Sequence, residues 1–171
     1  NATSERSGHE NLGAIGTLGC RGEAMASIAA VSQVTRTTKK QGAKTPEATR
    51  VVVHGGELVE HTATGAPEGT TVIVEGLFYN TPARRKFQKT VATELAHIYD
   101  MVERMALAHR DISFVLSYQG KERFCTFGNG SFEDVIAAVF GQSFAKELVP
   151  VNGTYGIVTV SGFVTRQGSE M

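Results

Sequence analysis

Residues 13–31 read GAIGTLGCRGEAMASIAAV, in which a glycine-rich stretch runs directly into a segment of strong helix formers. Glycines occur at every third position from Gly13 to Gly22, and apolar side chains from Met25 to Val31 recur at helical spacing. The pattern predicts a glycine-rich loop that opens a buried helix. The first N–H groups of a helix lack partners, and the helix dipole is positive at that end. Phosphate is therefore the ligand that this loop favours.

The spacing of these glycines is compatible with two interpretations. It matches neither the P-loop nor the dinucleotide-binding fingerprint, so the motif is weak when it is taken alone. Glycine also permits tight turns that bind nothing. On spacing alone, a phosphate loop and a purely structural loop both remain open.

The next part of the chain predicts an antiparallel sheet. Residues 34–38 are β-branched, and residues 50–64 form a hairpin around the two-residue turn Gly55-Gly56. Residues 70–76 add a strand whose continuous apolar run is typical of a covered sheet. The hairpin register pairs Val53 with Leu58, Val52 with Val59, His54 with Glu57 and Arg50 with His61. We interpret the histidines as surface residues, because zinc requires three or four converging ligands.

A long amphipathic helix is predicted for residues 93–109, with its apolar face on the preceding sheet. A second hairpin follows in residues 112–127, and a capping box at Ser131 opens a helix that runs to Phe140. Residues 155–165 alternate as a final strand. The change of pattern near residue 110 predicts a domain boundary there, with α/β layers on both sides.

The composition excludes several classes of protein. The 171 residues carry 17 Lys+Arg against 17 Asp+Glu, so no net positive charge favours indiscriminate nucleic-acid binding. A hydrophobic fraction of 41% is sufficient for a packed core. The sequence contains no apolar run long enough for a membrane span and no secretory signal. Two cysteines exclude a disulfide framework and favour a reducing compartment.

Two stretches resemble the signature sequences of the MutL family, the ATPases of DNA mismatch repair. They are TLGCRGEAMASI at residues 17–28 and GTTVIVEGLFYNTPARRKF at residues 69–87. The opening Ala2-Thr3-Ser4 resembles the family's ATP lid, and the region after residue 111 resembles its second domain. The resemblance thus covers essentially the whole chain. It places the chain among the GHKL ATPases, beside gyrase B and histidine kinases.

This resemblance implies an α+β fold with α/β layers, divided into two parts. Residues 1–110 would be the C-terminal part of a GHKL ATPase domain, containing the ATP lid, the phosphate loop, the sheet and the long helix. Residues 111–171 would be the truncated start of a second, transducer-like α/β domain that resembles domain 2 of ribosomal protein S5. Both ends of the chain look cut rather than natural, since no initiator Met is present.

The resemblance also implies a set of ATP-binding residues. The set comprises Thr3, Ser4, Gly19, Cys20, Arg21, Gly22, Glu23, Ala24 and Thr71. Thr3 and Ser4 would lie in the lid, residues 19–24 would wrap the triphosphate with main-chain N–H groups, and Thr71 would lie near the nucleotide on a core strand. The family usually has Phe where this chain has Cys20. Main-chain contacts do not depend on that side chain, so we expect phosphate binding to survive.

The family's catalytic residues precede the lid, so we expect none of them in this chain. A Glu that activates water, an Asn that holds Mg²⁺ and an Asp-Gly-Asn-type loop that recognises adenine would all lie upstream. We therefore predict no catalytic residue and no metal ligand here, and no ATP hydrolysis by this piece alone. The full-length parent would bind ATP and Mg²⁺, whereas this piece alone would hold neither.

In the parent, the resemblance implies ATP-driven work on DNA. Nucleotide would order the lid, the N-terminal regions would form a homo- or hetero-dimer, and the closed state would clamp DNA. Its partners would be a mismatch-recognition protein and a repair nuclease or helicase, with no membrane involved. The location would be the cytoplasm beside the prokaryotic nucleoid, or the nucleus in a eukaryote.

Two other functions remain open at this point. Arg84, Arg85 and Lys86 form a basic cluster beside Tyr79 and Phe87, which would suit contact with DNA phosphates. The same residues would equally suit a solvated helix start. The first alternative is therefore a non-enzymatic nucleic-acid-binding module, and the second is another GHKL ATPase such as a topoisomerase subunit.

Overall fold

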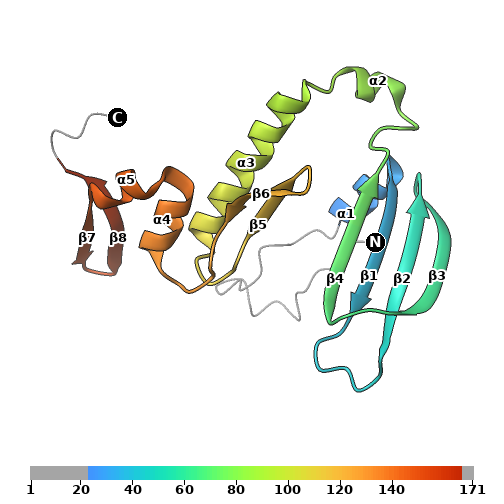
Figure 1. The fold of residues 1–171 in the computed structure, drawn as a ribbon, viewed down its shortest axis with the longest axis horizontal. Coiled ribbons are helices and arrows are strands. Elements are labelled where there is room, and N and C mark those ends of the chain that lie inside the picture. The colour runs from blue at the N-terminus through green and yellow to red at the C-terminus, as the bar shows by residue number, and fades with distance from the viewer. Residues whose placement is uncertain (1–22, 167–171) are drawn as a thin grey trace. The chain divides into compact units, whose positions relative to one another are not determined.

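The computed structural model describes residues 23–166 (Figure 1). By its internal contacts the chain divides into two compact units, Asn1–Gln88 and Lys89–Met171. Within residues 23–166, no helix is both long and apolar enough to cross a lipid bilayer.

The first unit is built on a four-stranded antiparallel sheet. Its strands are β1 (Gln33–Lys39), β2 (Glu47–His54), β3 (Glu57–Gly65) and β4 (Gly69–Glu75), in the order β3-β2-β1-β4. Helix α1 (Ala24–Ala30) precedes the sheet, and helix α2 (Pro82–Lys86) follows it. Every strand predicted for this region is present. Ala29, Val34, Ala48 and Val52 are its buried apolar residues.

The β2–β3 hairpin confirms the predicted turn but corrects part of the predicted register. The observed pairs are Val53 with Leu58, His54 with Glu57, Val52 with Glu60 and Arg50 with Thr62. The two pairs next to the turn are as predicted, whereas Val52 and Arg50 each face a residue one position later in β3. A bulge between Val52 and Val53 causes the shift. A bulge adds one residue to one strand, so the turn length does not reveal it.

The second unit packs three helices with two hairpins. The elements are α3 (Val91–Ala108), β5 (Val115–Tyr118), β6 (Lys121–Cys125), α4 (Phe132–Phe140), α5 (Gln142–Lys146), β7 (Leu148–Tyr155) and β8 (Val158–Thr165). Ala106, Phe124 and Val135 form its buried cluster, contributed by α3, β6 and α4. Half of the predicted capping box is present, since the Ser131 hydroxyl accepts a hydrogen bond from Asp134 N–H over 3.1 Å, whereas Ser131 N–H donates to Asn129 Oδ1 over 3.0 Å rather than to the Asp134 side chain. Ser131 thereby caps α4.

Helix α3 contributes to the core of the second unit. Ala106 is buried there, and Val102 packs against the same cluster. The predicted packing of its apolar face on the sheet of the first unit stays a prediction. Helical periodicity locates an apolar face but does not identify its partner. The assignment of residues 1–110 and 111–171 to two family domains stays a prediction.

Candidate functional site

Helix α1 begins directly after the glycine-rich stretch. Its hydrogen bonds start with Ser27 N–H, which donates to the Glu23 carbonyl over 2.9 Å. Glu23 is the N-cap residue, yet its side chain accepts no hydrogen bond from the helix, and the first turn carries no acidic side chain. Glu23 and Ala24, both predicted to contact ATP, are exposed at this end. Within residues 23–166, no side chain caps the first-turn N–H groups, and a negative group placed there would be stabilised.

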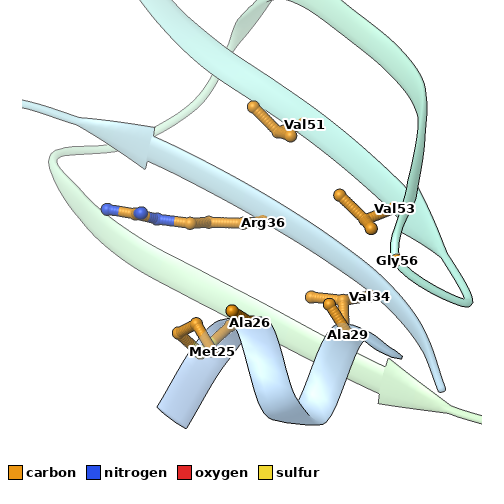
Figure 2. Close-up of a pocket in the computed structure, with 8 residues that line it drawn as sticks. All are labelled: Met25, Ala26, Ala29, Val34, Arg36, Val51, Val53 and Gly56. Carbon is orange, nitrogen blue, oxygen red and sulfur yellow. The ribbon is translucent and has the colours of Figure 1, made fainter. Parts of the chain in front are cut away.

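A pocket of about 300 Å³ lies between α1 and one face of the sheet (Figure 2). It is lined by Met25, Ala26 and Ala29 of α1, Val34 and Arg36 of β1, Val51 and Val53 of β2, and Gly56 of the turn. Among the described residues of this lining, Arg36 alone is charged. The lining identifies the sheet face that α1 covers, because side chains alternate between the faces of a strand.

Thr70 of β4 lies on the face that α1 covers. It pairs with Thr38 of β1, and the two hydroxyl oxygens are 2.7 Å apart. Val72 follows on the same face, where it pairs with the pocket residue Arg36. Residues directly opposite each other in an antiparallel pair share a face, so Thr70 and Val72 lie on the same sheet face as the pocket, although neither lines it and both are exposed.

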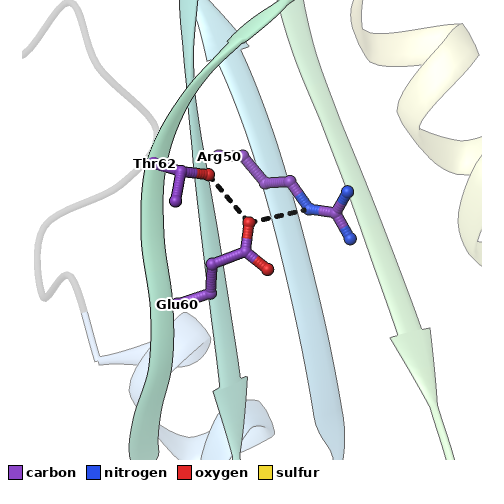
Figure 3. A network of polar contacts seen from close by, with 3 residues as sticks. All are labelled: Arg50, Glu60 and Thr62. Carbon is purple, nitrogen blue, oxygen red and sulfur yellow. Dashed lines mark hydrogen bonds and ion pairs between the residues drawn. The ribbon is translucent and has the colours of Figure 1, made fainter.

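Thr71, which was predicted to lie near the nucleotide, is on the opposite face. It pairs with Thr37, which in turn pairs with Arg50. Arg50 Nε lies 3.7 Å from Glu60 Oε1, and the Thr62 hydroxyl donates to that same oxygen over 2.7 Å (Figure 3). These ion-pair side chains are 46% and 39% exposed. The register therefore separates Thr71 from the face that α1 covers.

The segment that follows β4 holds the end of α1. The Asn80 side-chain amide donates to the Ala30 carbonyl over 2.9 Å, and Phe78 N–H donates to the Val31 carbonyl over 2.7 Å. Phe78 and Asn80 belong to the stretch that resembles the MutL family, but their sequence does not reveal this role. The only hint in the sequence is the amide side chain of Asn80, two residues before Pro82. Sequence spacing does not show that its acceptor, the Ala30 carbonyl, lies 50 residues away.

Most of the predicted ATP-binding residues lie outside the part of the chain that the structure describes. They are Thr3, Ser4, Gly19, Cys20, Arg21 and Gly22. Among the described residues, Glu23 and Ala24 lie together at the start of α1, and Thr71 does not lie on the face that this helix covers.

The predicted basic cluster lies on α2. Arg84, Arg85 and Lys86 occupy its last turn and are exposed. Within residues 23–166, the structure shows no ion pair involving these three side chains. Cations near the end of a helix also interact favourably with its dipole. Their position is therefore compatible both with contact to phosphates and with a purely structural role.

Between Glu23 and Arg166, no group of three or more His, Cys, Asp or Glu side chains lies close enough to hold a metal ion.

The chain is similar in sequence to DNA mismatch repair proteins. No family model matches it. The DNA mismatch repair protein MutL of Methanocorpusculum labreanum is 66% identical over 170 residues, covering 99% of this chain and 29% of the relative. MutL of Methanoculleus marisnigri is 50% identical over 165 residues, covering 96% and 28%. The chain thus spans less than a third of the length of these curated relatives.

The fold is similar to that of solved MutL ATPase domains. The Aquifex aeolicus MutL ATPase domain complexed with ADP superposes with a TM-score of 0.75 and 26% identity, covering 86% of this chain and 58% of that one. The N-terminal domain of a DNA repair protein gives a TM-score of 0.70 and 25% identity, covering 89% and 50%. These likenesses confirm the predicted fold class, a mixed α/β fold of the GHKL ATPase type with antiparallel sheets.

Proposed function

Because this chain belongs to the MutL family of DNA mismatch repair proteins, we propose that it forms part of the ATPase region of a longer repair protein and contacts ATP where α1 begins. The likeness to a MutL ATPase domain solved with ADP carries the proposal. The first turn of α1 supports it, because no described side chain caps its N–H groups and such groups suit an anionic ligand. The relatives named above are mismatch repair proteins, which favours this function over that of a topoisomerase subunit.

Three groups of residues contribute to nucleotide binding in this proposal. The main-chain N–H groups of residues 19–24 hold the phosphates, and Thr3 and Ser4 belong to a lid that closes over them. On β4 the register favours Thr70 over Thr71 as the residue beside the nucleotide, since Thr70 lies on the face that α1 covers.

Mg²⁺ and the water-activating group belong, in this proposal, to residues outside the described ones. The chain between Glu23 and Arg166 offers no metal-binding cluster, so no step of hydrolysis is assigned to its own side chains. Its contribution is to bind and orient the triphosphate. ATP would order the lid, drive dimerisation of the N-terminal regions and signal to repair partners.

Contact with DNA would involve the basic cluster of α2. Arg84, Arg85 and Lys86 are exposed and, within the described residues, have no carboxylate partner, which leaves their charges available to phosphates. DNA is found in the nucleoid or the nucleus, and the longer protein would act there.

A pair of adjacent substitutions tests the proposed nucleotide site. In the longer protein, ATP at about 100 times its dissociation constant should stabilise the folded state by about 2.7 kcal/mol. Thr70→Ala should weaken ATP binding about tenfold or more, because it removes a hydrogen-bonding group from the ligand's side of β4. Thr71→Ala changes the same residue type on the other face and should leave the affinity within about twofold. Equal effects of the two substitutions, or no stabilisation by ATP, would contradict the proposal.

A further inference from the structure

The end of α1 is bonded to segments far away in the sequence. Helix α1 has seven residues, and helices this short are unstable alone in water, so surrounding contacts must hold it in place. Its last carbonyls accept hydrogen bonds from Asn80 Nδ2 at 2.9 Å and from Phe78 N–H at 2.7 Å. The Ser32 hydroxyl also donates to the Ile28 carbonyl over 2.6 Å. The chain itself therefore fixes the C-terminal end of α1.

Asn80 is in turn held by a rigid turn. Tyr79 N–H donates to the Gly76 carbonyl over 2.9 Å, and Thr81 N–H donates to the Phe78 carbonyl over 3.1 Å. Phe78 has a φ of 63°, a conformation that a bulky side chain adopts only when its surroundings enforce it. The turn therefore places the Asn80 backbone where its side-chain amide reaches the Ala30 carbonyl.

We infer that Asn80 is a positioning residue for the proposed nucleotide site. It holds the last turn of α1, and a helix of this length transmits that placement over about 10 Å to Glu23 and Ala24 at its other end. This inference rests on the proposed function, because it concerns the same site. Asn80 acts only through α1 and need not touch the nucleotide.

Two substitutions of Asn80 and one control separate positioning from folding. Asn80→Ala removes the donor to Ala30, and Asn80→Asp keeps the shape but places a carboxylate against that carbonyl oxygen. Thr81→Val is the matched control, since the adjacent Thr81 Oγ1 is buried without a hydrogen-bond partner. In the longer protein, kcat/KM for ATP should fall by about tenfold to a hundredfold in both Asn80 variants, more in Asn80→Asp. Thr81→Val should stay within about twofold of wild type.

Amide hydrogen exchange on the present chain gives a second measurement that does not depend on ATP. The Ser27 amide, bonded to the Glu23 carbonyl in the first turn of α1, should exchange about tenfold faster in Asn80→Asp, because that turn opens more often. Amides of the β2–β3 hairpin should be unchanged. A general loss of stability would instead accelerate exchange in both regions.

The outcomes distinguish this inference from the proposed function. Wild-type protein that neither binds nor hydrolyses ATP would refute the proposed function and the inference together. Normal turnover in wild type and in Asn80→Asp, or unchanged exchange at Ser27, would refute the inference alone. Lost turnover with local acceleration of exchange in α1, absent from Thr81→Val, would support it.

Discussion

Substituting Gly55 with alanine should destabilise the first unit through two separate costs. Gly55 lies in the β2–β3 turn with a φ of +59°, a left-handed conformation that costs an alanine about 1–2 kcal/mol. The new Cβ would also lie 2.7 Å from Tyr79 Oη and 3.3 Å from Asn80 Nδ2. The Tyr79 side chain must move to relieve the first contact. Tyr79 is 43% exposed, so its side chain can move. We expect this contact to lower the free energy of unfolding by about 1 kcal/mol beyond the backbone strain.

Two comparisons isolate the contact from the backbone strain. Gly42 has a φ of +69°, and a Cβ there would meet nothing within 4 Å, so Gly42→Ala should show the strain of about 1–2 kcal/mol alone. In a Tyr79→Phe background the hydroxyl is gone, and the nearest ring atom, Cζ, lies at an ordinary contact distance of 3.7 Å. Gly55→Ala should therefore cost about 1 kcal/mol less in that background than in wild type.

Native-state hydrogen exchange of the β1–β4 amides is the appropriate assay, because a chain with two compact units need not unfold in a single transition. The free energy of opening is compared across the wild type, the two glycine variants, Tyr79→Phe and the double variant. An equal cost of Gly55→Ala with and without the Tyr79 hydroxyl would refute the reasoning, since the contact would then contribute nothing. A cost no larger than that of Gly42→Ala would refute it as well.

Two further predictions concern α4 and α2. Ser131→Ala should destabilise the second unit by about 1 kcal/mol, because it removes the hydroxyl that accepts a hydrogen bond from Asp134 N–H. Hydrogen exchange of the α4 amides measures this loss, and unchanged exchange would contradict the role of this cap. The second change replaces three residues of α2 together with alanine: Arg84, Arg85 and Lys86. For DNA binding by the longer protein, the slope of log K against log salt concentration should become smaller in magnitude by up to about 2.7 if all three side chains contact phosphates. Replacing Lys39, Lys40 and Lys44 near the β1–β2 turn provides the charge-matched control, and equal changes of slope would contradict a specific role of α2.

The elements of the first unit could be predicted because local residues determine them. β-branched runs define β1 and β4, and Gly55-Gly56 defines the turn between β2 and β3. Strand β7 was missed for a local reason as well: it contains Pro150, Asn152 and Gly153, which are residue types depleted in strands. Its pairing with β8 nevertheless holds it as a strand.

The features that could not be predicted depend on contacts distant in sequence. The bulge in the β2–β3 pair and the bond from Asn80 to Ala30 both depend on contacts that no local pattern specifies. Thr71 shows the same limit at the candidate site. The resemblance places a threonine near the nucleotide, but only the pairing of β4 with β1 shows which of the two adjacent threonines lies on the face that α1 covers.

The two ends of α1 are satisfied in different ways, and the difference is physically informative. The longer helices α3 and α4 begin with Thr90 and Ser131, whose hydroxyls accept hydrogen bonds from the first turn. Among the described residues, no side chain of the N-cap residue accepts such a bond in the shorter helices α1, α2 and α5. The missing side-chain cap is therefore common to the short helices and does not by itself distinguish α1. What distinguishes α1 is that a residue distant in sequence fixes its C-terminal end, through a bond to Ala30 that spans 50 residues. The first N–H groups of the helix, which can donate to an anion, are thereby held at a position that the rest of the chain determines.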